Sequence, residues 1–529
     1  MKKYVFFLIL ISLTALWPFF KKGFFETHDG EWMIIRFSAF HQTLTSGQFP
    51  VRFVDRLNNN YGYPVINFLY PLPFYLSELP KILGFTFVDS VKTVFVISTV
   101  FSVVAMFWAL SQFFSKYASL AGAIVYLFIP YRFVDLYVRG SLGENVAFAI
   151  APLILGSIFK INKNKKEFLP ILSFGIALLI ISHNVLAILF IPLFFLLSIL
   201  LAKKNIAKII FSFFTGFLIS AFFWLPAFYD LQFVKLSQIK VSDISDHLSS
   251  FEKLIIPSWG YGQTPQQLNG LSPQFGLASF AVFVAIIFLF LKSKSKDKIV
   301  CILIIGYMTI FFLMTNYASL LWKIPLIDII QFPWRLLSLV VLISALLTAY
   351  VVDSTKSKKI VAGLIIAICI ISTITYTKPA KFVDREEGFY STNEDTTTVR
   401  DEYLPLWVNQ KPQARANNKV EIVGAGEITL SEIKPANYKA NINAKNDLTV
   451  KVNTVYFPGW EATVDDQKVN IDYLSDSGGL MSIKLPEGNH KVIIKYGKTP
   501  VHLFSELISL IALTGTGIYF FRVWRKQNS

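Results

Sequence analysis

Long apolar runs separated by short polar stretches dominate the pattern along this chain. A segment that crosses a lipid bilayer needs about 20 apolar residues, or somewhat fewer where flanking Lys or Arg side chains reach the interface. About twelve runs meet this requirement, so the pattern predicts a polytopic all-α membrane protein. The predicted spans are Tyr4–Phe20, Val91–Phe114, Tyr117–Pro130, Glu144–Lys160, Phe168–Ser182, Val185–Ala202, Ile206–Phe228, Phe275–Leu291, Ile299–Met314, Leu336–Val352, Ile360–Tyr376 and Val501–Phe521.

The stretch "YPVINFLYPLPFYLSELP" (63–80) is also apolar, but it carries four prolines. Counting it as a span would move the basic cluster "KINKNKKE" (160–167) and every later basic cluster to the opposite side of the membrane. We therefore interpret it as a re-entrant or interfacial segment, whose backbone must be satisfied by protein or water.

The basic clusters between the apolar runs set the predicted orientation. With a cytoplasmic N-terminus, the clusters at 116, 160–167, 203–208, 292–298, 353–359 and 522–526 all fall on the cytoplasmic side. This is the positive-inside bias of membrane proteins, and only the pair Lys21–Lys22 departs from it. The sequence thus predicts a multi-pass protein of the plasma membrane with both termini in the cytoplasm.

A polar segment from about 377 to 500 interrupts the apolar pattern. It is rich in Asn, Asp, Thr and Lys, and it contains alternating runs such as "NDLTVKVNTVYF" and turn signals such as "PGW" and "PEGN". These features predict an extracytoplasmic β-sandwich-like module. The predicted organisation is a transmembrane domain at 1–376, the β-rich module at 377–500, and a last span with a basic cytoplasmic tail at 501–529.

Composition agrees with this class and excludes others. The 529 residues are 54% hydrophobic and only 16% charged, which is too apolar for a soluble domain. The net charge of +16 is spread over the short clusters between spans, so we do not expect nucleic acid as a partner. Cys301 and Cys369 both lie within apolar runs, where neither a disulfide nor a CxxC metal site is available.

The first outer loop holds the acidic stretch "ETHDGEW" (26–32) directly after the first apolar run. Asp29 and Glu31 are candidate functional carboxylates there, although an exposed loop carboxylate is common. Asp55 in the same loop is a further candidate for substrate contact. His183, in a tight turn between two spans, either contacts substrate or only caps the turn.

A second outer segment, "YRFVDLYVRGSLGEN" (131–145), supplies Asp135, Arg139 and Glu144. Arginines beside carboxylates suit the binding of a phosphate or a cation. The alternative is a mutual network that only fixes helix ends, with Glu144 as an N-terminal helix carboxylate. In "QFPWRLL" (331–337), Arg335 is either a phosphate ligand or an interface anchor beside Trp334.

These stretches resemble the membrane glycosyltransferases of the C-type fold (GT-C). The resemblance rests on the early outer aspartate, on "GYPVINFLYPLPFY" and on "YRFVDLYVRGSLGE". Two bacterial groups are most similar: the membrane domain named "6-pyruvoyl-tetrahydropterin synthase-related" and the YfhO-like proteins. The latter share a module of the type "YFPGWEATVDDQKV … LPEGNHKVIIKY" before a last span. Nothing in the sequence supports pterin chemistry.

The resemblance implies roles for the candidate residues. Asp29 matches the family's catalytic base or acceptor-positioning aspartate, with Glu31 and Asp55 as weaker candidates. The spacing "DGE" departs from the family's paired acids, which leaves Asp29 and Glu31 as alternatives. Asp135, Arg139 and Glu144 match the region that binds a metal or the donor phosphate, and Arg335 would suit the lipid phosphate. A divalent cation, Mg or Mn, is the one cofactor that the resemblance implies, and the alternative is a reaction without a cofactor.

We therefore expect a glycosyltransferase that moves a sugar from a polyprenyl-phosphate donor to an extracytoplasmic envelope acceptor, which could be a saccharide, a lipid or a protein. Nucleotide sugars are absent outside the cell, so a transferase at the outer face must use a lipid-linked sugar. Its leaving phosphate must then be stabilised by Arg or a cation. Two alternatives remain: a transporter or flippase of a lipid-linked saccharide, and a non-catalytic envelope assembly protein. The chain lacks GxxxxGK[ST], GxSxG and HExxH sequences, which argues against ATP-driven transport and against those hydrolase classes.

Overall fold

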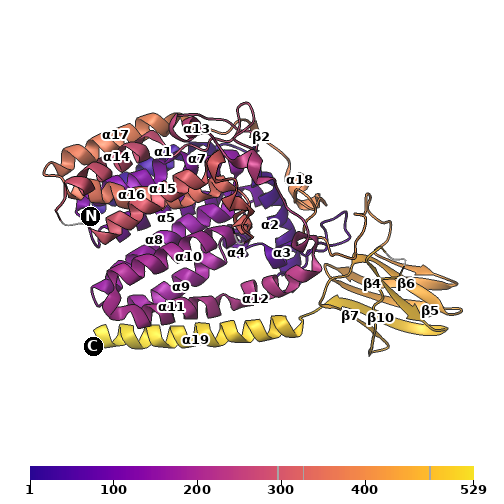
Figure 1. Cartoon of the computed structure of the whole chain (residues 1–529). Helices are drawn as coiled ribbons and strands as arrows, with labels where there is room; N and C mark the ends of the chain where they lie inside the picture. The colour runs from indigo at the N-terminus through magenta and orange to yellow at the C-terminus, as the bar shows by residue number, and fades with distance from the viewer. Residues whose placement is uncertain (295–296, 326, 476–477, 529) are drawn as a thin grey trace.

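The protein consists of a helical bundle and a β-sandwich module that extends from one end of it (Figure 1). The structure, a computed structural model, describes residues 1–294, 297–325, 327–475 and 478–528. Both chain termini lie at the end of the bundle away from the module, and α19 runs along the bundle between the two ends (Figure 1).

The bundle contains helices of very different lengths. In chain order they are α1 (Lys2–Ala15), α2 (Gly30–Thr45), α3 (Val65–Phe68), α4 (Leu72–Ile82), α5 (Phe87–Leu110), α6 (Lys116–Phe128), α7 (Pro130–Phe133), α8 (Leu142–Asn162), α9 (Phe168–Ile180), α10 (Asn184–Leu201), α11 (Ile206–Ile219), α12 (Ala221–Asp230), α13 (Phe251–Ile255), α14 (Leu277–Lys292), α15 (Lys298–Leu313), α16 (Leu337–Asp353), α17 (Lys358–Thr373), α18 (Glu387–Thr392) and α19 (Pro500–Asn528).

Several of these helices are long and apolar enough to cross a membrane. Within the described residues there are six such helices, or eight if each of two bent pairs counts as one span. Three shorter apolar helices, α9, α14 and α15, accompany them. A membrane location follows from these helices, whereas the predicted count of about twelve spans is not established by their lengths.

Two predicted spans are broken. The span expected at 117–130 is α6, which meets the segment Pro130–Arg139 at 47°. Proline lacks an N–H and disfavours helical geometry in the residue before it, and Ile129 is accordingly extended, with ψ 136°. The span expected at 206–228 bends by 65° between α11 and α12, at Ser220.

The proline-rich stretch 63–80 folds as part of two short helices, α3 and α4. Pro64 and Pro71 lie directly before the two helices, where the missing N–H costs nothing. At 11 residues, α4 is too short to cross a bilayer.

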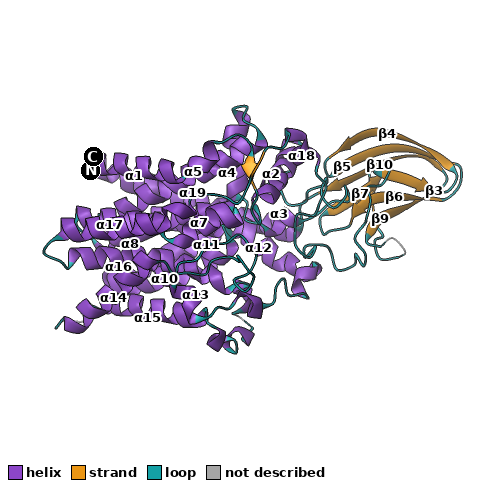
Figure 2. Ribbon diagram, turned by 90° about the horizontal axis from the view of Figure 1, so that it is seen from above, coloured by secondary structure: helices purple, strands orange, loops and turns teal. Residues whose placement is uncertain are grey.

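The module is a sandwich of two antiparallel sheets. The larger has the strand order β4-β5-β10-β7-β8 and the smaller has the order β3-β6-β9. Figure 2 shows the strands side by side beyond the end of the bundle. Trp460 is buried between Phe53 and Tyr438, so it is a core residue of the module. The strands are β3 (Val420–Val423), β4 (Gly426–Lys434), β5 (Asn437–Ala444), β6 (Leu448–Val455), β7 (Trp460–Val464), β8 (Gln467–Val469), β9 (Leu480–Leu485) and β10 (Gly488–Tyr496).

The first part of the polar segment belongs to the surface of the bundle. Strand β2 (Phe382–Val383) pairs antiparallel with β1 (Phe24–Phe25), which lies between α1 and α2. The short helix α18 then packs against α2. The strands of the sandwich lie within 420–496, and the residues around α18 contact Glu31, Gln42 and Asn59 of the bundle.

Candidate active site

The loop at 26–29, directly before α2, is held against the turn that follows α7. The backbone N–H of His28 donates to the Val138 carbonyl (3.0 Å), and that of Asp29 donates to the Arg139 carbonyl (2.8 Å). Gly140 has φ +65°, and a Cβ there would lie 2.4 Å from a side-chain oxygen of the first loop. Glycine is therefore required at this close approach. The two loops are in fixed register, which places Asp29 beside Arg139.

Arg139 is the centre of the charged cluster. Its Nη1 lies 2.5 Å from Oε1 of Glu144 and 3.0 Å from Oδ1 of Asp135, and its Nη2 lies 3.9 Å from Oδ2 of Asp29. The hydroxyl of Tyr131 donates to the other oxygen of Glu144 at 2.8 Å. Three of the predicted residues thus converge on one arginine.

Arg335 and His183 approach the same carboxylate from other elements. Nε of Arg335 lies 3.9 Å from Oε1 of Glu144, while its Nη1 donates to Oε1 of Gln331 at 2.8 Å. His183 caps α10 by accepting the N–H of Leu186 at Nδ1 (3.2 Å), so its Nε2 carries the hydrogen. That Nε2 lies 3.7 Å from Glu144. His183 therefore both caps the turn and faces the cluster.

Aromatic rings line the arginines and the histidine. The guanidinium of Arg139 lies 4.4 Å from the ring centre of Trp334, and that of Arg335 lies 5.8 Å from it. The rings of Tyr70 and His183 are 4.7 Å apart. Cation–π contact is strongest where water is excluded, so these rings hold the guanidinium planes in place.

The cluster is buried except at one point. The Asp29 side chain is 42% exposed, whereas that of Arg335 is only 11% exposed. The other members, Asp135, Arg139, Glu144 and His183, are buried. Burying charges costs free energy, and ionisable groups at this depth in a membrane protein are usually retained for pairing or function. The geometry leaves the Asp29 carboxylate accessible at the edge of a network of fixed charge.

The alternative carboxylate, Glu31, points into a different environment. Arg385 donates from Nε to Oε1 of Glu31 at 2.6 Å, and the hydroxyl of Tyr390 donates to the same oxygen at 3.2 Å. Glu31 therefore joins α2 to the segment around α18, and Asp29 is the carboxylate of this pair that faces Arg139.

Asp55, in the connection between α2 and α3, lies apart from the cluster and contacts the module. Nζ of Lys419 is 2.7 Å from its Oδ1, and the hydroxyl of Tyr438 donates to that oxygen at 2.5 Å. Burial lowers the pKa of Lys419 despite the attraction of Asp55. The structure therefore gives Asp55 a contact with the module and does not bring it together with Asp29.

Tyr131 is a member of the cluster that sequence reasoning missed. Its spacing contains a signal, because Tyr131, Asp135 and Arg139 follow one another at intervals of four residues. In a helical turn such positions share one face. The face they share is the one that meets Glu144.

The carboxylates of the cluster are paired with arginine and tyrosine. Among the residues that the structure describes, no group of three or more His, Cys, Asp and Glu side chains is arranged to hold a metal ion. The divalent cation that the GT-C resemblance implies therefore stays a prediction.

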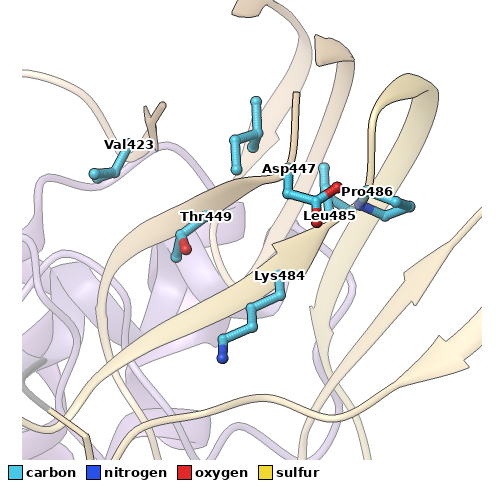
Figure 3. A pocket seen from close by; sticks show the side chains of 7 residues that line it. Val423, Asp447, Thr449, Lys484, Leu485 and Pro486 are labelled. Atoms are coloured by element: carbon cyan, nitrogen blue, oxygen red, sulfur yellow. The ribbon is translucent and has the colours of Figure 1, made fainter. Parts of the chain in front are cut away.

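Two hollows on the surface lie outside the cluster. One, of about 320 Å³, is on the module and is lined by Val423, Asp447, Thr449, Lys484 and neighbouring residues (Figure 3). The other, of about 200 Å³, is apolar and lies between α14, α16 and α17. None of the predicted site residues lines either hollow.

Comparisons with known proteins give a partial family match and a distant likeness in fold. An uncharacterized protein of Lactococcus lactis subsp. cremoris (strain MG1363) is 25% identical over 242 residues, which cover 42% of this chain. The chain spans only 39% of the length of that relative.

Three solved structures are similar at low identity. Arabinofuranosyltransferase AftD from Mycobacteria has a TM-score of 0.48 and 13% identity, and the match covers 74% of this chain and 28% of that one. ArnT from Cupriavidus metallidurans, bound to undecaprenyl phosphate, has a TM-score of 0.42 and 11% identity over 70% and 64% of the two chains. The oligosaccharyltransferase of Archaeoglobus fulgidus has a TM-score of 0.42 and 10% identity over 76% and 62%.

The family match falls on the C-terminal part of the chain. It covers the module, the residues that lead into it and the beginning of α19. Residues 405–509 match the family described as Bacterial membrane protein YfhO, which confirms for this region the resemblance that the sequence indicates.

Proposed function

We propose that this chain is an integral membrane glycosyltransferase that transfers a sugar from a polyprenyl-phosphate donor to an acceptor of the cell envelope. The observation that carries the proposal is the partly exposed Asp29 carboxylate at the edge of a buried cluster in which Arg139 and Arg335 both face Glu144. This arrangement offers one accessible base beside fixed positive charge.

In the proposed reaction the Asp29 carboxylate and the two arginines have different roles. The bond between the anomeric carbon and the phosphate oxygen breaks, and the acceptor oxygen forms the new bond to that carbon. Asp29 takes the proton of the acceptor hydroxyl. The phosphate leaves with the electron pair, and its charge is stabilised by Arg139 and Arg335.

Arg335 has a free donor for this purpose. Among the described residues its buried Nε has no hydrogen-bond partner, although it lies 3.9 Å from Glu144. A buried donor without a partner costs free energy. A phosphate oxygen next to Nε would satisfy it, and we assign Arg335 to the donor phosphate on this ground.

The side of the membrane and the cofactor remain part of the proposal. The positive-inside bias puts the cluster at the outer face, where the donor must be a lipid-linked sugar. Because the described side chains do not fit a three-ligand cation site, no step is assigned to a metal. The dependence on Mg or Mn stays a prediction, which transfer with and without EDTA tests.

The leaving group is the same for every sugar, so undecaprenyl phosphate is a suitable probe. The purified full-length protein in liposomes should retain undecaprenyl phosphate in native mass spectrometry. With undecaprenyl phosphate that carries labelled glucose, galactose, N-acetylglucosamine or arabinose, label should pass to a solubilised envelope-polysaccharide fraction. Label that crosses the bilayer still attached to lipid would identify a transporter instead. Neither binding nor transfer would overturn the proposal.

A further inference from the structure

His28 precedes Asp29 directly, and the proposed reaction leaves it without a role. Its Nε2 lies 3.0 Å from the carbonyl oxygen of Tyr261, in the outer loop between α13 and α14. A carbonyl can only accept a hydrogen bond, so Nε2 must carry the hydrogen. In the neutral ring the lone pair is then on Nδ1.

The surroundings favour this neutral form. Burial lowers the pKa of His28, and this outweighs the opposite effect of the Tyr261 carbonyl and of the neighbouring Asp29 carboxylate. The residue lies outside the membrane-spanning helices and is only partly buried. Within the part of the chain that the structure describes, Nδ1 takes part in no hydrogen bond. The ring therefore presents a free acceptor at neutral pH.

The position of the ring is fixed on both sides. The backbone N–H of His28 donates a hydrogen bond to the Val138 carbonyl. The residue that binds its ring is itself held, because the Tyr261 hydroxyl donates to the Lys378 carbonyl at 3.1 Å. Because the ring is ordered before the substrate arrives, a hydrogen bond to Nδ1 costs little conformational entropy.

We propose that Nδ1 of His28 accepts a hydrogen bond from a second hydroxyl of the acceptor, next to the hydroxyl that Asp29 deprotonates. The inference rests on the proposed function, and it narrows the acceptor to a polyol with neighbouring hydroxyls, such as a saccharide. The neighbouring residues His28 and Asp29 then accept hydrogen bonds from two neighbouring hydroxyls of the substrate. His28 undergoes no proton transfer and determines how the acceptor is bound.

Two substitutions separate this role from a structural one. In His28→Asn the amide oxygen can replace Nδ1, while the bond to Tyr261 is lost. In His28→Gln the amide nitrogen can replace Nε2 and keep that bond, while the acceptor at Nδ1 is lost. A ring that only ties the outer loop in place needs Nε2, whereas a ring that binds the acceptor needs Nδ1.

The measurement is the apparent KM of the full-length protein for the solubilised envelope-polysaccharide fraction. His28→Gln should raise this KM about tenfold, the effect of one lost hydrogen bond with its partner left unpaired. His28→Asn should stay within about threefold of the unmodified protein. In both variants, undecaprenyl phosphate binding and the kcat at saturating acceptor should equal those of the unmodified protein. His490→Gln, on the module, is the control and should change nothing.

The opposite order of the two variants would overturn the inference, because it would show that the bond to Tyr261 is what matters. Loss of undecaprenyl phosphate binding or a fall in Tm in both variants would also overturn it, as a structural effect. In each of these outcomes the unmodified protein still transfers label, so only the role of His28 is overturned. A failure of the proposed function is different, because the unmodified protein would then transfer no label.

Discussion

At the scale of single residues, Arg139 is the side chain through which the loop before α2 meets the segment between α7 and α8. It contacts Asp135, Glu144 and Asp29, and its guanidinium plane rests against Trp334. A buried arginine is stable only while its charge is compensated, so the carboxylates around it do not contribute equally. Glu144 is fully buried and has the shortest contact with Arg139.

Removing Glu144 should therefore destabilise the protein strongly. Glu144→Ala leaves Arg139 without its main partner, and breaking a buried pair from one side typically costs about 3–5 kcal/mol. In Glu31→Gln, which weakens the more exposed pair with Arg385, the cost should be about 1 kcal/mol or less. Thermal unfolding in detergent compares the two, and equal Tm values for both variants would contradict this assignment.

Arg335 should act on donor binding rather than on stability. Its Nε is the buried donor without a partner among the described residues, and a hydrogen bond to a charged group is worth about 1.5–3 kcal/mol. Arg335→Ala should therefore weaken undecaprenyl phosphate binding by about tenfold to a hundredfold. Arg385→Ala, which removes a more exposed arginine of the outer surface, is the control. Unchanged binding in Arg335→Ala would remove this residue from the donor site.

At the scale of elements, the connection between α2 and α3 joins the bundle to the module. Phe53 of this loop stacks on Tyr496 at 5.3 Å, and Asp55 pairs with the buried Lys419. The backbone N–H of Val455 donates to the carbonyl of Tyr61 at 2.7 Å. The module is thus attached through packed contacts and not only through its chain connections.

A double substitution tests this attachment. Asp55→Ala leaves Lys419 buried and uncompensated, which should cost about 3–5 kcal/mol. Adding Lys419→Met removes that charge and fills its volume, so the double variant should recover most of the loss in Tm. A double variant no more stable than Asp55→Ala alone would show that the pair is not the source of the effect.

The helices and the module could be predicted because their signals are local. Apolar runs and alternating strands are recognised from neighbouring residues in the sequence. The same periodicity indicates which face of the element is buried. The break of the span at Pro130 also has a local cause, although the apolar run continues up to it. The bend at Ser220 lacks such a signal in the sequence.

The site could be predicted in part. Asp29, Asp135, Arg139, Glu144, His183 and Arg335 were expected to lie at one face, and the structure brings them together. The different places of Glu31 and Asp55 could not be foreseen, because their partners Arg385 and Lys419 come from the far end of the chain. Pairings over such separations depend on the tertiary fold and leave no periodic signal.

At the scale of the whole molecule, the two ends of the bundle differ in character. The termini lie at one end and the module at the other, with α2, which begins after Asp29, close to the module (Figure 1). Within the bundle, Asp29 directly precedes α2, and Glu144 lies in the first turn of α8. Asp29 is the exposed member of the cluster, so an acceptor would meet it before it met the buried charges.

Reporter fusions test the sidedness that the account requires. A fusion at Lys165, in the basic cluster between α8 and α9, should report the cytoplasm, and one at Asn446 in the module should report the outside. The reason is that the basic clusters fall on one side only if the module is outside. Reports from the same side at both positions would contradict the topology and the lipid-linked donor together.

Asp29 is the proposed catalytic base, and a single substitution of it tests this role. Asp29→Asn keeps the shape of the side chain and removes its basicity. Glu26→Gln is a matched control, because Glu26 lies in the same loop, pairs with Lys381 and has a similar exposure, 46% against 42%. Removing a positioned base typically lowers the rate about 10²–10⁴-fold. Neutralising an exposed carboxylate changes stability by about 0.5 kcal/mol or less.

The measurement is the rate at which label passes from undecaprenyl-phosphate sugar to the envelope-polysaccharide fraction, together with Tm. We expect Asp29→Asn to lose transfer while its Tm and its binding of undecaprenyl phosphate are unchanged, and Glu26→Gln to keep both activity and stability. Full transfer activity in Asp29→Asn would contradict the account.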